Sequence, residues 1–165
     1  MLPPKLILAP IDFSDPSRAA LDVAANMASR LGAEVLLVHV MPAISDLPKS
    51  VSIFKEGQYD QSLNEKAEQQ LKELATTLAQ KNVEARTQLG EANDVGMELI
   101  RIAESKNVDM IIIATHGMTG WRKIAFGSVA EKVVKEAECP VLVLRAKAAT
   151  SASHSRQTAS SSASD

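Results

Sequence analysis

Apolar residues along this chain follow two alternating periods. Short, largely apolar runs lie at residues 5–11, 34–40, 83–89, 108–114 and 140–144. Such runs are typical of strands that are buried on both faces of a sheet. Between these runs, apolar residues recur at every third or fourth position, as on one face of a helix, over residues 16–31, 63–78, 92–106 and 129–137. Five strands therefore alternate with four helices, and the run at 83–89 is the weakest and most polar.

Signals at the ends of these elements support the assignment. Ser14, or an Asp beside it, can cap the first helix with Pro16 in its first turn, and Gly32 ends that helix. Residues 42–59 carry Pro48, Gly57 and mixed polarity. That composition predicts a long connection, with room for one short helical piece.

The alternation of strands and helices predicts an α/β fold. We expect a single domain with an open five-stranded parallel sheet, helices on both of its faces and right-handed crossovers. In such sheets, ligands bind beyond the carboxyl ends of the strands, at the point where the strand order reverses. The loops after the first and fourth strands are therefore where we expect a site.

Composition narrows the class of protein. The 165 residues leave room for one domain, which we place at 1–145, followed at 146–165 by a predicted disordered tail rich in Ala, Ser and Thr. A net charge of -2 and scattered basic residues argue against a nucleic-acid surface. Cys139 is the single cysteine, so we expect no internal disulfide, no cysteine-based metal cluster and a cytoplasmic location. Without a leader pattern or a long apolar stretch, we expect no membrane insertion.

The loop after the fourth strand carries a pattern suited to an anion. It holds Gly117, Gly120 and Gly127, and Gly127 with Ser128 opens the next helix. Glycines let backbone N–H groups approach an oxyanion closely, and the start of a helix favours negative charge. A second interpretation stays open, because Ser128 with Glu131 is a capping box that needs no ligand. The glycines and the nearby basic residues can equally be ordinary turn and surface residues.

Other α/β classes fit less well. The segment before Ser128 lacks the lysine of a P-loop, and the turn after the first strand lacks the glycines of a dinucleotide-binding fingerprint. The third strand ends in Leu89, Gly90 and Glu91, without a clear phosphoacceptor aspartate of a phosphorelay receiver. His39 lies within an apolar strand and is best interpreted as a hydrogen-bonded structural histidine. Cys139 is interpreted as a small buried hydrophobe.

A set of motifs resembles one known family. Residues 114–117, nine further residues and then Gly127 and Ser128 resemble the G-x-x-G, nine residues, G-[ST] nucleotide loop of the universal stress protein family. The resemblance also includes residues 10–12 with Ser14 and Ser17, residues 38–40, residues 128–133 and residues 139–143. It implies a Rossmann-like fold of the adenine nucleotide alpha-hydrolase type, with strand order 3-2-1-4-5.

The resemblance further implies a site for ATP, or for AMP or ADP, with any Mg or Mn ion held through the phosphates. The equivalents of Ile11 and Val40 frame the adenine, and the equivalent of Asp12 lies by the nucleoside. The whole implied set is Pro10, Ile11, Asp12, Val40, Ala114, His116, Gly117, Gly127, Ser128 and Val129. One position departs from the motif, because Ala114 occupies the position of the motif's first glycine. Alanine is tolerated there if only a small side chain is needed, and costs about 1 kcal/mol if φ must be positive.

Three functions remain open at this stage. The first is a cytoplasmic stress-response regulator that binds ATP or AMP and presents an altered surface to a regulatory protein. The family resemblance implies a homodimer, and the apolar strand from Val141 to Leu144, expected at a sheet edge, is its predicted contact. The second is an interaction module of the same family without nucleotide binding. The third is a slow ATPase. The argument against it is that no pair of carboxylate or histidine side chains is evidently arranged to activate water.

Overall fold

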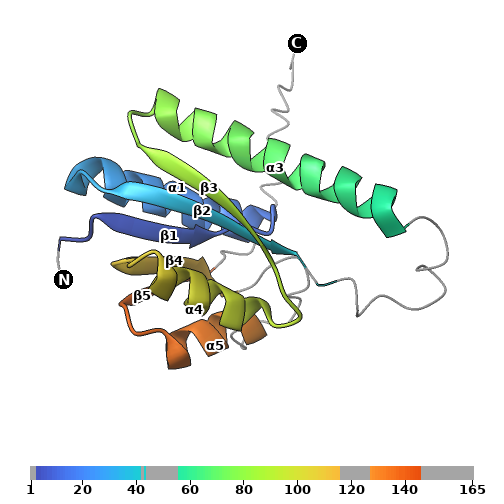
Figure 1. Ribbon diagram of the computed structural model, residues 1–165. Coiled ribbons are helices and arrows are strands. Elements are labelled where there is room, and N and C mark those ends of the chain that lie inside the picture. The colour runs from blue at the N-terminus through green and yellow to red at the C-terminus, as the bar shows by residue number, and fades with distance from the viewer. Residues whose placement is uncertain (1–2, 42, 44–55, 116–126, 146–165) are drawn as a thin grey trace, which may run out of the picture.

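The computed structural model describes residues 3–41, 43, 56–115 and 127–145, and the predicted tail lies outside them. Strands and helices alternate along the chain as predicted (Figure 1). The elements are β1 (Leu6–Pro10), α1 (Asp15–Leu31), β2 (Glu34–Met41), α3 (Glu56–Gln80), β3 (Ala85–Glu91), α4 (Val95–Ser105), β4 (Met110–Ala114), α5 (Ser128–Glu136) and β5 (Val141–Leu144).

The five strands form one parallel sheet in the order β3-β2-β1-β4-β5, which confirms the predicted fold. The central strand β1 pairs with β2 on one side and with β4 on the other. The chain therefore moves outward in one direction from β1 to β3 and then crosses back to β4. This reversal places the carboxyl ends of β1 and β4 side by side, at the position where such sheets bind ligands.

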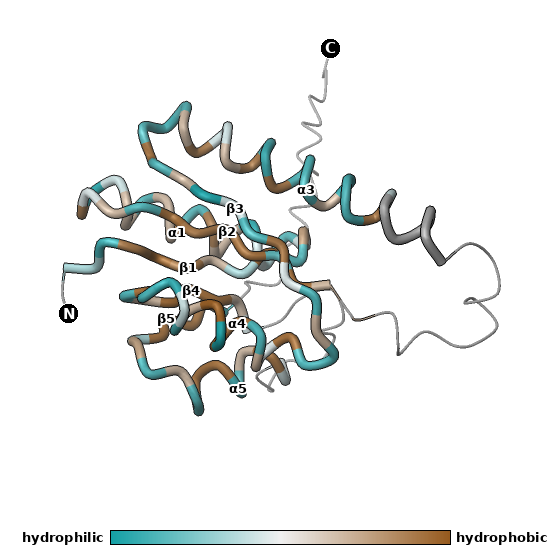
Figure 2. Tube along the Cα trace, in the orientation of Figure 1, coloured by the Kyte–Doolittle hydropathy of each residue, from teal (hydrophilic) through white to brown (hydrophobic). Residues whose placement is uncertain are grey.

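Side chains of each strand alternate between two cores, one on each face of the sheet. In β4, Ile112 packs into one core, while Ile111 and Ile113 pack into the other. The first core is covered by α1 and α3 and the second by α4 and α5 (Figure 1). Because the inner strands are buried on both faces, they are hydrophobic almost throughout their length (Figure 2).

The partly exposed carboxylate of Asp109 ties two strands together at their beginnings. Asp109 Oδ2 accepts hydrogen bonds from the backbone N–H groups of Lys5 (2.8 Å) and Leu6 (2.9 Å). These two donors hold the pKa of the Asp109 carboxyl below its ordinary value. The contact joins the residue before β4 to the start of β1.

The ends of α1 follow the sequence signals. Ser14 caps the helix by accepting from the Ser17 N–H, a proline occupies the first turn, and Gly32 closes the helix with φ +66°. The left-handed conformation at Gly32 is the one that favours glycine, since a side chain there costs about 1–2 kcal/mol. The Gly32 N–H returns to the Ala28 carbonyl, which satisfies a carbonyl in the last turn of the helix.

Several expectations from the sequence need correction. Helix α3 begins at Glu56, inside the segment expected to be a loop up to residue 59, and β3 lies two residues later than the predicted run. Leu31 and Leu63, expected on buried helix faces, are 41% and 44% exposed because they lie at the ends of their stripes. Cys139 is only half-buried rather than buried, and this partial desolvation raises the pKa of its thiol.

Candidate functional site

A pocket of about 320 Å³ opens at the carboxyl ends of β1, β2 and β4. Its volume falls at the lower end of the range of about 300–1,000 Å³ for small-molecule sites. Eight of the ten residues implied by the family resemblance line it, and His116 and Gly117 lie outside the described residues. The eight are Pro10, Ile11, Asp12, Val40, Ala114, Gly127, Ser128 and Val129. The topology therefore brings together residues 10–12, Val40, Ala114 and residues 127–129, which are separated in the sequence.

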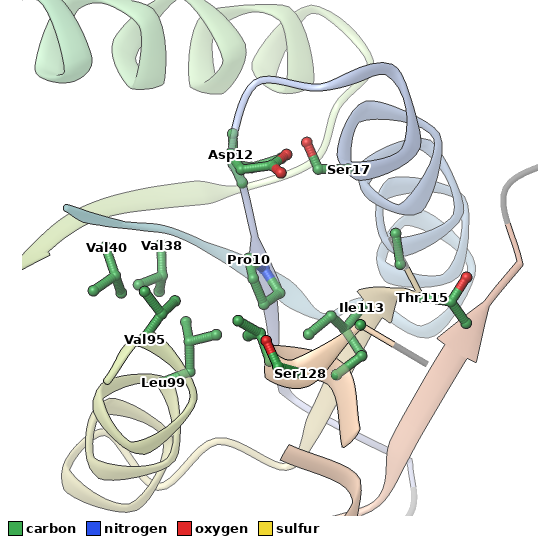
Figure 3. A pocket seen from close by; sticks show the side chains of 15 residues that line it. Pro10, Asp12, Ser17, Val38, Val40, Val95, Leu99, Ile113, Thr115 and Ser128 are labelled. Atoms are coloured by element: carbon green, nitrogen blue, oxygen red, sulfur yellow. The ribbon is translucent and has the colours of Figure 1, made fainter. Parts of the chain in front are cut away.

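One wall of the pocket is apolar. Figure 3 shows Val38 and Val40 of β2 beside Val95 and Leu99 of α4. The two valines lie two residues apart on one strand, so they face the same side of the sheet, the side that α4 covers. Val95 and Leu99 lie one helical turn apart and complete the wall. One face of a flat apolar ring could pack against this wall.

Polar groups gather on the turn between β1 and α1. The Asp12 carboxylate accepts hydrogen bonds from the Ser14 N–H (3.1 Å) and from Ser14 Oγ (2.5 Å). Ser17 is buried and donates its hydroxyl proton to the Ser14 carbonyl at 2.9 Å. Between Asp12 and Ser14, Phe13 adopts φ +64°, an unusual conformation for a residue with a side chain. The turn thus presents Asp12 and Ser17 to the pocket in a defined arrangement (Figure 3).

The start of α5 forms the opposite side of the pocket. Gly127 is the N-cap residue and Ser128 is the first residue of the helix, and among the described residues no side chain caps this helix start. The capping-box interpretation is therefore wrong, because Ser128 lies one position too late to cap. Glu131 instead pairs with Lys135 at 2.6 Å, which lowers the pKa of its carboxyl. A helix start without a side-chain cap leaves its first N–H groups directed at the pocket, where an anion is favoured.

The departure from the family motif at Ala114 carries no conformational cost. Ala114 is the last residue of β4 and pairs with Leu144 of β5, so its backbone is extended. It is absent from the residues with positive φ, which are Phe13, Asn82, Asn107 and Gly32. The position therefore does not require a glycine. Next to it, the Thr115 carbonyl accepts from the Gly127 N–H at 2.6 Å, which joins the end of β4 to the start of α5.

The helices α4 and α5, which both line the pocket, are joined to each other beside it by an ion pair. Asp94 caps α4 through the Met97 N–H (3.0 Å) and pairs with Lys132 of α5, and both contacts lower the pKa of its carboxyl. The stem of Lys132 crosses Gly96 so closely that a Cβ atom at Gly96 would lie 3.0 Å from the Lys132 Cδ atom. A side chain at Gly96 would require the Lys132 stem to shift by a few tenths of an ångström, so glycine suits this close approach of the two helices. These contacts join α4 to α5 beside the pocket, which Val95 and Val129 of the two helices line.

The pocket residues that sequence reasoning missed lie mainly on secondary structure. They are Ser17, Val38, Val95, Leu99, Ile113, Thr115 and Ala130. Four of them belong to motifs that carry the family resemblance: Ser17, Val38, Thr115 and Ala130. Val95 and Leu99 lie on the apolar stripe of the helix predicted at 92–106, and no local signal separates a pocket wall from a core face.

Within the described parts of the chain, no group of three or more His, Cys, Asp or Glu side chains could hold a metal ion. Among the same residues, no helix is both long enough and apolar enough to span a membrane. Any divalent ion in this pocket would therefore depend on ligands beyond these described side chains, such as phosphates.

Comparison with known proteins agrees with this geometry. The model of the universal stress protein family matches residues 4–145. Universal stress protein MJ0531 of Methanocaldococcus jannaschii is 35% identical over 144 residues, which cover 86% of this chain and 82% of the relative. The solved structure of protein MJ0577 from the same organism has a TM-score of 0.75 at 32% identity, and the match covers 87% of this chain and 97% of that one.

This chain belongs to the universal stress protein family. A universal stress protein from Archaeoglobus fulgidus, solved in complex with dAMP, has a TM-score of 0.60 at 21% identity. That match covers 87% of this chain and 98% of the other, and at this identity it shows the common fold.

Proposed function

We propose that this protein is a cytoplasmic stress-response regulator that binds an adenine nucleotide, ATP or AMP, in the pocket at the ends of β1 and β4. The observation that carries the proposal is the pairing of an apolar wall with an uncapped helix start in one pocket. The apolar wall of Val38, Val40, Val95 and Leu99 suits a purine ring, and the start of α5 suits a phosphate group. The dAMP complex of a relative with the same fold supports the class of ligand.

Binding rather than hydrolysis is the function that this pocket supports. Among its described lining residues, Asp12 is the one carboxylate, and its Oδ1 atom already accepts from Ser14. A general base needs to reach the water that it activates, commonly as one of a pair of titratable groups. Occupancy of the pocket by ATP or AMP would instead change the surface that a regulatory protein recognises.

The protein acts as a homodimer in this proposal. Strand β5 pairs with β4 on one side only, and all four of its residues, Val141–Leu144, are partly exposed. An apolar edge strand exposes unpaired backbone groups, and pairing with a second copy about a two-fold axis would cover them. The half-buried free thiol of Cys139, one residue before Pro140, fits the reducing conditions of the cytoplasm.

The test is a calorimetric titration of nucleotide-free protein with magnesium ATP and with AMP. A micromolar dissociation constant corresponds to about -8 kcal/mol, and ligand at 100 times that constant should stabilise the fold by about 2.7 kcal/mol. The melting temperature should then rise by roughly 5–10 °C. No heat and no thermal shift with either nucleotide would leave the interaction module as the better description.

A matched pair of variants on α4 locates the ligand. Val95→Trp fills the pocket mouth and should weaken binding at least tenfold, because Val95 lines the pocket. Met97 lies two residues further along the same helix, is 44% exposed and does not line the pocket. The variant Met97→Trp should therefore bind the nucleotide as the parent protein does. Equal binding by both variants would place the nucleotide elsewhere.

A further inference from the structure

The hydrogen-bond ladder between β1 and β2 ends beside the pocket, at Ile11. The register pairs Pro10 with Val38, so the next pair is Ile11 with His39. The Ile11 N–H still donates to the Val38 carbonyl at 2.8 Å. In a parallel ladder, the next bond would run from the Val40 N–H back to the Ile11 carbonyl. Among the backbone hydrogen bonds of the described residues, no bond joins these two groups.

The Ile11 carbonyl is occupied by a side chain. His39 Nδ1 lies 2.6 Å from the Ile11 carbonyl oxygen. Because a carbonyl oxygen can only accept, Nδ1 must carry the proton and donate it. The His39 side chain thus makes the bond that the Val40 N–H would make in a continued ladder.

The same imidazole also contacts the turn that follows β1. The ring centroids of His39 and Phe13 lie 4.7 Å apart, with the planes tilted by 44°. Phe13 is the residue with φ +64°, and it carries the chain from Ile11 and Asp12 into α1. One side chain therefore holds both the last carbonyl of the ladder and the turn that departs from it.

We propose that His39 is a positioning residue of the nucleotide site. By donating to the Ile11 carbonyl in place of the Val40 N–H, it ends the ladder between two residues that both line the pocket. Among the described residues no acceptor takes the Val40 N–H, which leaves it to donate to a ring nitrogen of the purine base. His39 itself lies on the other face of β2 from Val38 and Val40, since successive strand residues alternate, and it does not line the pocket. This inference rests on the proposed nucleotide function.

Two variants separate the hydrogen bond from the ring. His39→Asn places an amide N–H group where Nδ1 stands and removes the ring, whereas His39→Phe keeps an aromatic ring against Phe13 and removes the donor. If His39 acts through its donor, the asparagine variant should resemble the parent protein and the phenylalanine variant should not. If it acts only by filling space beside Phe13, the order of the two variants reverses.

The first readout needs no nucleotide. Amide hydrogen exchange by NMR should show the Val40 N–H exchanging faster than the Val38 N–H in the parent and in His39→Asn. In His39→Phe, the released Ile11 carbonyl should accept from the Val40 N–H and slow its exchange at least tenfold. Unchanged exchange at Val40 in His39→Phe would overturn the proposal whether or not the protein binds nucleotide.

The second readout is calorimetric titration of the same three proteins with magnesium ATP. Loss of one base hydrogen bond should weaken binding about tenfold in His39→Phe, with His39→Asn within about threefold of the parent. Equal losses in both variants, or none in His39→Phe, would overturn the role of the donor. Absence of binding by the parent would instead refute the proposed function, and the exchange experiment would still decide whether His39 ends the ladder.

Discussion

Gly127 offers the sharpest test of a phosphate site at the start of α5. It caps that helix with φ -61° and ψ 147°, a conformation that any residue adopts, so a substitution there adds no backbone strain. Its N–H bond to the Thr115 carbonyl involves only the backbone and is kept by any residue except proline. Gly127→Glu would therefore add a carboxylate at the pocket rim while the helix start stays in place.

The magnitude follows from the charge that is added. A carboxylate about 6 Å from a phosphate costs about 0.7 kcal/mol per unit charge at the dielectric constant of water and about 3 kcal/mol at an effective value of 20. The pocket lies between these limits, so we expect binding of magnesium ATP to weaken by about 10- to 100-fold. The added charge should not destabilise the fold, because an anion is favourable at a helix start.

Gly127→Gln is the matched control, since it has nearly the same shape and no charge. Any cost of replacing glycine at the cap, up to about 1 kcal/mol, is common to both variants. Calorimetric titration should show much weaker binding for the glutamate than for the glutamine variant, and the difference should shrink in 1 M salt. Undiminished binding by Gly127→Glu, or equal losses in both variants, would refute a phosphate at this helix start.

Two further predictions concern the dimer and acid stability. Val143→Lys places a charge on the apolar edge strand and should yield a monomer by light scattering. The control Val134→Lys, at a position already 46% exposed on α5, should leave the mass unchanged. Equal masses for the two variants would show that β5 is not the dimer contact. Because the folded state lowers the pKa of Asp109, this carboxylate contributes stability above about pH 4, its unfolded value, and loses that contribution as the pH falls through the folded pKa. Asp109→Asn should therefore have a lower free energy of unfolding than the parent at pH 7 in denaturant titrations, and the difference should disappear below about pH 4. A difference that does not depend on pH would show that the charge of Asp109 is immaterial.

Local sequence patterns were sufficient for the elements and for part of the site. Short apolar runs are properties of neighbouring residues, so β1 and β4, whose central residues are all buried, could be placed without knowledge of the fold. The cap at Ser14 and the left-handed turn at Gly32 are equally local. The rule that ligands bind at the carboxyl ends of strands then directed attention to the loops after residues 10 and 114, where the pocket lies.

Local patterns failed where two interpretations had the same signature. Ser128 and Glu131 have the spacing of a capping box, yet the helix begins one residue earlier than that motif requires, and Gly127 takes the cap. The early part of α3 has the sequence pattern of a loop, since Gly57 and a run of mostly polar residues weaken the helical period. Burial of Leu31 and Leu63 was overestimated, because a helical stripe does not reveal where the sheet beneath it ends.

The sequence by itself determined the class of fold, the two apolar faces of the sheet and the chain segments that could meet an anion, because each depends on residues a few positions apart. Only the tertiary structure decided which side chains share the pocket. The pairing of β2 beside β1, and the packing of α4 on that face, bring Val40 against Val95 and Leu99. The register of those strands also sets His39 opposite the Ile11 carbonyl. Such contacts join residues tens of positions apart, and they depend on strand order and register, which no local period encodes.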